Sequence, residues 1–92
     1  MPALSSSLKQ LYLYPNPAQE AAQIHFNLDK EGAVSIILYD VTGKIQGVVT
    51  SDRSLLPGEH QFTIDLKGLP SGNYFVGVIC DGANSVLKLT KE

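Results

Sequence analysis

The segment of residues 69–81 constrains the fold more than any other part of the chain. It reads Leu-Pro-Ser-Gly-Asn-Tyr-Phe-Val-Gly-Val-Ile-Cys-Asp, a turn followed by a long apolar run. Pro70 suits the early part of a turn, and Gly72 can adopt a positive φ at little cost. From Tyr74 onward both alternating faces are apolar, which is typical of a strand in the middle of a sheet. We therefore expect a central β-strand, then a turn, then a return strand over residues 84–91.

Other short apolar or alternating segments recur at intervals of about 8–12 residues. The clearest, residues 22–29, places Ala22, Ile24, Phe26 and Leu28 on one face. We predict further strands at 11–14, 33–40, 45–50 and 61–66, a bulge near Gly47, and the longest loop at 51–59. No segment is long enough and periodic enough to predict a helix. The spacing predicts an all-β chain, an immunoglobulin-like antiparallel β-sandwich of about seven strands.

The start of the central strand resembles the tyrosine corner of fibronectin-type domains. In that corner, a tyrosine near the beginning of strand F bonds a backbone group a few residues upstream. Residues 69–74 have this arrangement, with Tyr74 following a Pro and a Gly. We therefore expect Tyr74 to be buried and its hydroxyl to hold the preceding turn.

Composition excludes several classes of partner. A formal net charge of −2 without a basic cluster argues against binding to nucleic acid or to an acidic membrane surface. No apolar run approaches the roughly 18 residues of a membrane-spanning helix, so we expect no membrane insertion. Cys80 is the only cysteine, so no internal disulfide can form, and its apolar strand face predicts a buried side chain.

The sequence shows no catalytic or metal-binding constellation. It lacks a Gly-x-Ser-x-Gly, a phosphate-binding loop and a His-Glu-x-x-His motif. The Asp-Gly-Ala-Asn run at 81–84 is reminiscent of a calcium loop without the downstream acidic ligands. His25 lies on the polar face of its strand, and we expect it to be a solvated surface histidine. We predict no catalytic residue, no metal ligand, no cofactor and no enzymatic activity.

Three segments carry a shared resemblance. Residues 11–18 read Leu-Tyr-Leu-Tyr-Pro-Asn-Pro-Ala, residues 34–44 are a strand segment that ends in Gly-Lys, and residues 69–91 are the predicted closing hairpin. Together they resemble the opening Tyr-Pro-Asn-Pro, the strand with its Gly-basic turn and the closing hairpin of the C-terminal sorting domains of the type IX secretion system (Por secretion system) of Bacteroidetes, type A. The candidate sorting-motif residues are Tyr14, Pro15, Asn16, Pro17, Gly43, Gly72, Tyr74, Gly82, Lys88, Leu89 and Lys91.

The resemblance implies a role in protein secretion. Domains of this family carry an upstream passenger from the periplasm across the outer membrane, so the implied partners are translocon and sortase components and the passenger. In many members a sortase removes the domain and joins the passenger to anionic lipopolysaccharide. The implied location is the cell surface or the medium, reached through the periplasm. Any export signal is expected upstream of this sequence.

An outward-facing apolar set is the candidate partner surface. Ile37 and Tyr39 face away from the predicted core on one strand, and Phe75 and Ile79 do so on another. If the two strands are neighbours, these side chains form one patch, which typically marks a partner site and is the candidate contact for a weak homodimer. Alternatively, the 51–59 loop or the N-terminal segment covers this face. The terminal hairpin offers a second contact, because an edge strand can pair with a partner's strand.

Two other functions remain open on the sequence. One is a structural immunoglobulin-like spacer. The other is a carbohydrate-binding accessory module, for which Tyr12, Tyr14 and Tyr39 are the available aromatic residues in a chain without Trp. For domain organisation, we expect a linker or leader at 1–10, where processing would occur, and the folded sorting domain at 11–92.

Overall fold

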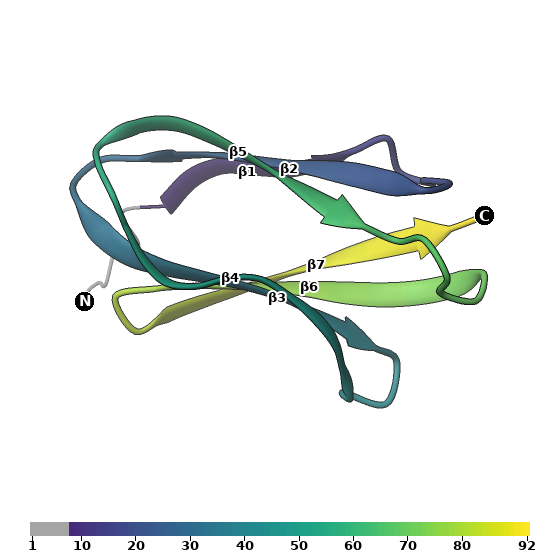
Figure 1. Ribbon diagram of the computed structural model, residues 1–92. Coiled ribbons are helices and arrows are strands. Elements are labelled where there is room, and N and C mark those ends of the chain that lie inside the picture. Colours follow the sequence, from purple (N-terminus) through teal and green to yellow (C-terminus); the bar gives the residue numbers. More distant parts are fainter. Residues whose placement is uncertain (1–7) are drawn as a thin grey trace.

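The computed structural model describes residues 8–92, which form two antiparallel sheets packed face to face (Figure 1). The chain is all-β, as predicted, with no helix among these residues. The seven strands are β1 (Leu8–Tyr14), β2 (Ala21–Leu28), β3 (Gly32–Asp40), β4 (Ile45–Leu55), β5 (Gly58–Asp65), β6 (Gly72–Cys80) and β7 (Ala83–Lys91).

The strands divide into a three-stranded and a four-stranded sheet. The order is β1-β2-β5 in the first sheet and β4-β3-β6-β7 in the second. The central position predicted for β6 is confirmed, because β3 and β7 flank it. The neighbouring position of β3 and β6 is confirmed as well, in the antiparallel register Ile37↔Gly77 and Tyr39↔Phe75.

The core lies between the two sheets and is built by strand alternation. In β2 every second residue is buried, which confirms the predicted inward face. The same holds for the inward faces of β3 and β6, and Cys80 is only 2% exposed. The alternation of residues 61–66 directs Phe62 inward, where it packs against the core while remaining partly exposed. Burial of each large aliphatic or aromatic side chain in such a core contributes about 1.5–3 kcal/mol.

The prediction of a long loop at 51–59 is wrong. Strand β4 continues to Leu55 and β5 begins at Gly58, so only two residues connect them. The polar run concealed the strand because β4 is an edge strand, where polar side chains on both faces are tolerated. Register shifts opposite β3 also remove the simple alternation, although Leu55 still pairs with Gly32 and is buried.

Strand β1 begins earlier than expected. Residues 8–10, assigned to the leader from sequence, belong to β1 and pair with the end of β2. A bulge between Lys9 and Tyr12 gives Gln10 a positive φ of 55° and shifts the register. The rest of the linker predicted at 1–10, where processing was expected, is residues 1–7, which lie outside the described residues.

His25 differs from its expected setting. It faces outward from β2, as its place in the alternation predicts, but it is only half exposed. Its ring stacks on Tyr12 at 4.9 Å and on Tyr14 at 4.8 Å between centroids. The register explains this burial, because Tyr12 is the direct cross-strand partner of His25. His25 is therefore part of an aromatic cluster and not a freely solvated histidine.

Candidate recognition surface

The segments that resemble sorting motifs meet at one end of the sandwich, on the right in Figure 1. At this end β3 finishes, β6 starts and β7 finishes, with Asp40 opposite Tyr74 and Gly72 opposite Lys91. The chain leaves β1 at Tyr14 and passes to the same end of β7. We call this region the motif end.

Asn16 joins the first motif to the last. Its side-chain Nδ2 donates to the carbonyl of Lys88 at 2.9 Å, and its Oδ1 accepts from the amide of Thr90 at 3.1 Å. The carboxamide thus makes the same pair of bonds that a neighbouring peptide group would make along the edge of β7. In the Tyr-Pro-Asn-Pro segment only the Asn16 side chain carries its donor and its acceptor on separate atoms, as a peptide group does. We call its two bonds to β7 the Asn16 clamp.

Ala18 extends this contact by its backbone. Its amide donates to the carbonyl of Thr90 and its carbonyl accepts from the amide of Glu92, both at 2.8 Å. The pairing is parallel to β7, and the Ala18 side chain is fully buried. The edge of β7 is therefore covered near its end, so an incoming strand could pair only with the earlier part of that edge.

The turn before β6 is held by the same terminal residues. The Tyr74 hydroxyl donates to the Pro70 carbonyl at 2.5 Å, which confirms the predicted tyrosine corner. Lys91 donates through Nζ to the Leu69 carbonyl, and Thr90 Oγ1 lies 3.0 Å from Asn73 Oδ1. Gly72 has the positive φ expected of it, at 147°. The Tyr74 and Lys91 bonds hold the turn, and the Thr90 bond ties the end of β7 to the start of β6.

The β3–β4 turn completes the motif end. Asp40 Oδ1 accepts from the Thr42 hydroxyl, the Thr42 amide and the Lys44 amide, and Oδ2 accepts from Gln46 Nε2. The Thr42 hydroxyl bond is the main cause that lowers the pKa of Asp40 below its ordinary value of 3.8, against a smaller opposing effect of burial. Gly43 provides the left-handed position of this turn, with φ of 88°.

The remaining candidate motif residues are distributed differently. Gly82 lies at the opposite end of the sandwich, in the two-residue β6–β7 turn, where Asp81 and Gly82 both have positive φ. Leu89 is a fully buried core residue, whereas Lys88 is exposed. Tyr14, Pro15 and Pro17 are exposed around Asn16. The structure therefore brings most of the set together and leaves Gly82 apart.

The four candidate partner-surface residues share the outer face of the four-stranded sheet. We call Ile37, Tyr39, Phe75 and Ile79 the outer patch; each is half-buried. The position of Tyr39 depends on Gly77, because a Cβ there would lie 3.0 Å from the Tyr39 ring. The glycine thus allows that ring to lie flat across β6. Residues 51–55 do not cover the patch, since they pair with β3 in the plane of the sheet.

Sequence reasoning missed the exposed rim of this patch. Val48 and Val86 lie in the same cross-strand row as Ile37 and are 56% and 60% exposed. Ile45, opposite Tyr39, is 54% exposed. Their outward direction could be found only after the strand order and the β4 register were known.

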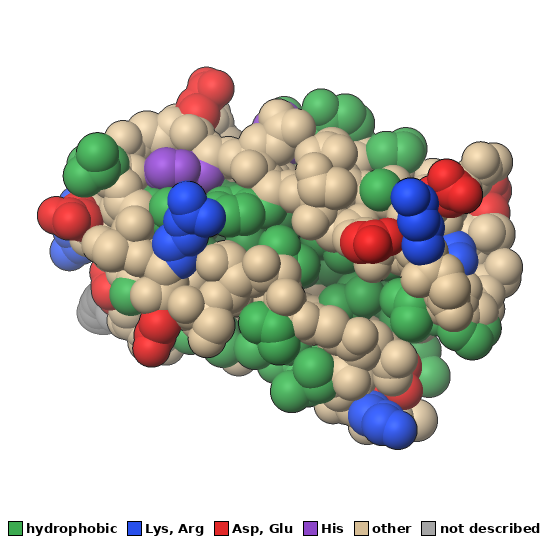
Figure 2. All heavy atoms as spheres, viewed as in Figure 1, with side chains coloured by type: hydrophobic (Ala, Val, Ile, Leu, Met, Phe, Trp, Pro, Cys, Tyr) green, Lys and Arg blue, Asp and Glu red, His purple; other side chains and the backbone are tan. Residues whose placement is uncertain are grey.

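The concave features of the surface are modest. A hollow of about 280 Å³ lies between the edges of β4 and β5 and is lined by Leu38, Val49 and Ile64 among others. Figure 2 shows hydrophobic side chains in the cleft between the two sheets on this side. Among residues 8–92, no three His, Cys, Asp or Glu side chains are grouped as a metal site would need. Nor does this part of the chain contain a helix long and apolar enough to cross a membrane.

Comparison with known proteins agrees with this architecture. A family model described as a secretion system C-terminal sorting domain matches residues 12–92. The crystal structure of dimeric latent PorU from Porphyromonas gingivalis matches at a TM-score of 0.69 and 17% identity, over 88% of this chain. The match spans only 9% of that chain, so it supports the fold alone. No curated protein sequence matches.

This seven-stranded sandwich, in which the segment after β1 is joined to the end of β7, is thus the fold of a secretion sorting domain. The chain belongs to the family of type IX secretion system C-terminal sorting domains. Its role is sorting within that system, in contact with the type IX machinery, and it is part of a secreted or cell-surface protein.

Proposed function

We propose that this chain carries an attached passenger from the periplasm across the outer membrane, and that the translocon recognises the assembled motif end. The observation that carries the proposal is the pair of bonds from Asn16 to Lys88 and Thr90, across 72 and 74 residues of sequence. Segments so far apart are adjacent only in the folded domain. Recognition would therefore require a folded domain and not a linear tag.

The later steps follow the family pattern. A sortase removes the domain at the segment before β1 and joins the passenger to anionic lipopolysaccharide. The domain itself has no catalytic role, and what activity the full protein has belongs to the passenger. The outer patch provides a second contact, to the machinery or to another copy in a weak homodimer. The dimeric PorU structure contains a domain of this fold, which supports testing for such a dimer.

A reporter fusion tests the sorting role. A folded reporter between a signal peptide and the full 92-residue chain should reach the surface or medium of a bacterium with type IX machinery. Removing residues 86–92 deletes most of β7 and should leave the reporter in the periplasm. A reporter retained with the intact chain, or exported equally without residues 86–92, would contradict the proposal and favour a structural spacer.

A subtler variant separates recognition from folding. Asn16→Ala removes the clamp but no core side chain, so the domain should fold while surface delivery falls. Asn84→Ala is the matched control, because Asn84 is an exposed Asn at the other end of β7. Equal export by these two variants would show that the assembled motif end is not what the translocon recognises.

The outer patch has its own test. Ile37→Lys and Phe75→Lys should leave a folded domain, because both side chains face away from the core, and should weaken export or dimerisation. Gln61→Lys on the outer face of the other sheet is the control. Unfolding of both patch variants in circular dichroism would show that these residues are structural and that the patch is not a contact surface.

A further inference from the structure

The outer face of the three-stranded sheet carries a second exposed feature, an aromatic cluster. Tyr12 and Tyr14 are 50% and 46% exposed, and their ring centroids lie 6.0 Å apart. Both stack on His25, with interplanar angles of 5° and 28°. The imidazole thereby fixes two tyrosine rings in nearly parallel planes at the β1 edge. Aromatic rings grouped and exposed on one face are typical of a binding site.

A polar network lies directly beside the rings. The cross-strand row of Tyr12 and His25 continues to Gln61 on β5, and the row of Tyr14 and Gln23 continues to Thr63. Gln23 Oε1 accepts from both Gln61 Nε2 and Thr63 Oγ1 at 2.9 Å. The face therefore presents aromatic rings next to amide and hydroxyl groups that already have fixed orientations.

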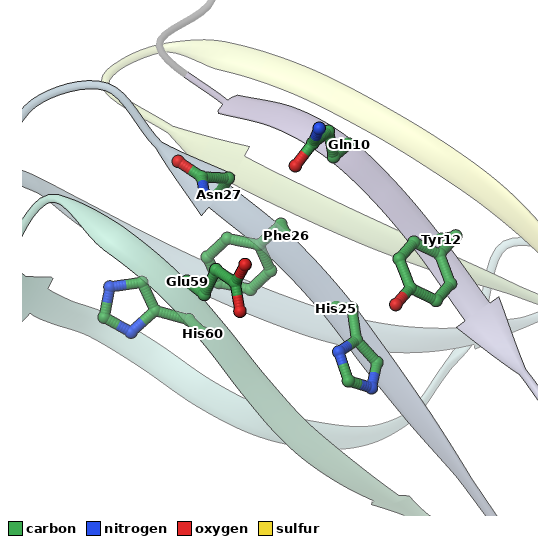
Figure 3. Close-up of a pocket in the computed structure, with 7 residues that line it drawn as sticks. All are labelled: Gln10, Tyr12, His25, Phe26, Asn27, Glu59 and His60. Carbon is green, nitrogen blue, oxygen red and sulfur yellow. The ribbon is translucent and has the colours of Figure 1, made fainter.

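A small hollow borders the cluster. It has a volume of about 80 Å³ and is lined by Gln10, Tyr12, His25, Asn27 and Glu59 among others (Figure 3). The lining side chains come from three adjacent strands, β1, β2 and β5. This volume is several times that of a water-sized site and well below the roughly 300 Å³ of a small-molecule pocket. It can hold one polar substituent of a larger ligand.

Two strained or unsatisfied groups occur at the same place. Gln10 has a left-handed φ of 55° at the β1 bulge, which turns its side chain to the hollow. The Nε2 atom of His25 is buried without a hydrogen-bond partner among the described residues. Backbone strain and unpaired buried polar atoms cost free energy and concentrate at binding sites.

The charges of this face select the ligand class. The cluster, the network and the hollow contain no Lys or Arg, and Glu59 is their only carboxylate. Lys9, the cross-strand partner of Asn27, is already paired with Asp29 at 2.9 Å, so these residues offer an anionic ligand no free Lys or Arg. Flat apolar rings beside neutral donors and acceptors suit a neutral sugar, whose ring has an apolar C–H face and a rim of hydroxyl groups.

We propose that Tyr12 and Tyr14 form a binding site for a neutral polysaccharide. Pyranose rings stack on the two tyrosines, their hydroxyls bond Gln61 and Thr63, and one ring substituent enters the hollow. This function goes beyond sorting, and it does not depend on the motif end.

Affinity gel electrophoresis of the full chain tests the proposal. The gels contain one neutral polysaccharide each: mannan, dextran, galactan, xylan or mixed-linkage β-glucan. At least one should slow the chain, with Tyr12→Ala and Tyr14→Ala each weakening affinity about tenfold, which corresponds to about 1.4 kcal/mol for the lost stacking contact. Tyr14→Phe keeps the ring and should keep binding. The control is Val48→Ser, which removes an exposed apolar side chain from the other sheet.

The outcomes are distinguishable. Retardation by none of the five polysaccharides overturns the proposal, and so does retardation that both Tyr→Ala variants leave unchanged. If a tyrosine variant fails to fold, Gln61→Ala replaces it, because Gln61 is exposed and outside the aromatic stack. Undiminished binding by folded Gln61→Ala would overturn the proposal in that case. Export of the reporter fusion is a separate measurement, so failure of either proposal leaves the other standing.

Discussion

The two ends of the sandwich are closed by different kinds of contact. At the motif end, Asn16, Ala18 and Lys91 bond to residues far away in sequence. At the opposite end the β6–β7 connection is a local two-residue turn, Asp81 and Gly82, and β4 passes to β5 through only two residues.

The β6–β7 turn needs only its own two strands, whereas the bonds at the motif end need segments from distant parts of the domain. A tight turn with two positive φ values is stable wherever its two strands pair. The Asn16 clamp exists only when β7 is already in place beside β6. A machine that contacts the motif end could therefore test whether folding is complete, whereas contact with the local β6–β7 turn could not. Substitutions at the two ends should therefore differ in the size of their effects and in how far those effects extend.

Tyr74→Ala should have the largest effect. The side chain is 5% exposed and also holds the Pro70 carbonyl, so its loss should lower the free energy of unfolding by about 3–5 kcal/mol. Tyr74→Phe keeps the ring and loses only the hydrogen bond, at about 1 kcal/mol. Urea denaturation measures both. A Tyr74→Ala midpoint equal to that of the parent would show that the corner does not stabilise the motif end.

Asn16→Ala should have an intermediate effect. Two side-chain bonds to the β7 backbone are lost, at about 0.5–1.5 kcal/mol each. Amide hydrogen exchange should show faster exchange at Thr90 and unchanged exchange at Asn84. Asn16→Asp keeps the acceptor for Thr90 and loses the donor for Lys88, so it should protect the Thr90 amide. Equal Thr90 protection in Asn16→Ala and the parent would mean that the clamp is not formed in solution.

Gly82→Ala should have a smaller and local effect. A φ of 82° costs a side-chain residue about 1–2 kcal/mol, while the space around the position is open. Gly82→Asn should cost less, because Asn tolerates left-handed φ. Exchange rates at the motif end should not change in either variant. A Thr90 amide that loses protection in Gly82→Ala would show that the two ends are coupled.

Asp40→Asn should have the smallest effect, and its effect should depend on pH. Because folding lowers the pKa of Asp40, the carboxylate stabilises the fold fully above its ordinary value of 3.8 and loses that contribution as pH falls through the lowered value. The parent should therefore melt slightly higher than Asp40→Asn at pH 6, and the difference should vanish in strong acid. A constant difference at all pH values would contradict the role given to the charge.

Much of the fold could be predicted because alternation is a local property. The inward face of β2 and the Tyr74 corner each follow from a few consecutive residues. The 51–59 segment could not be recognised as strand, because its pairing depends on bulges opposite β3. The partial burial of His25 could not be predicted for a similar reason, because the rings that cover it come from a neighbouring strand.

The candidate site, too, could be predicted only where consecutive residues determine it. A resemblance to a family selects residues by type and order, and it could not show that Asn16 bonds the backbone of β7 or that Gly82 lies at the other end. The outer patch was predicted only on the condition that β3 and β6 are neighbours. Its exposed rim required the register of β4 and β7 as well.

The clamp has one more consequence, for the chemical ageing of the protein. Asparagine converts to aspartate when the backbone nitrogen of the following residue attacks its carboxamide, and that nitrogen must first lose a proton. Asn16 is followed by Pro17, whose nitrogen carries no hydrogen. This route of deamidation is therefore closed at Asn16, whose amide group joins the segment after β1 to the last residues of β7. Asn84, followed by Ser85, has no such protection, so a stored sample should acquire aspartate there while the bond to Lys88 endures.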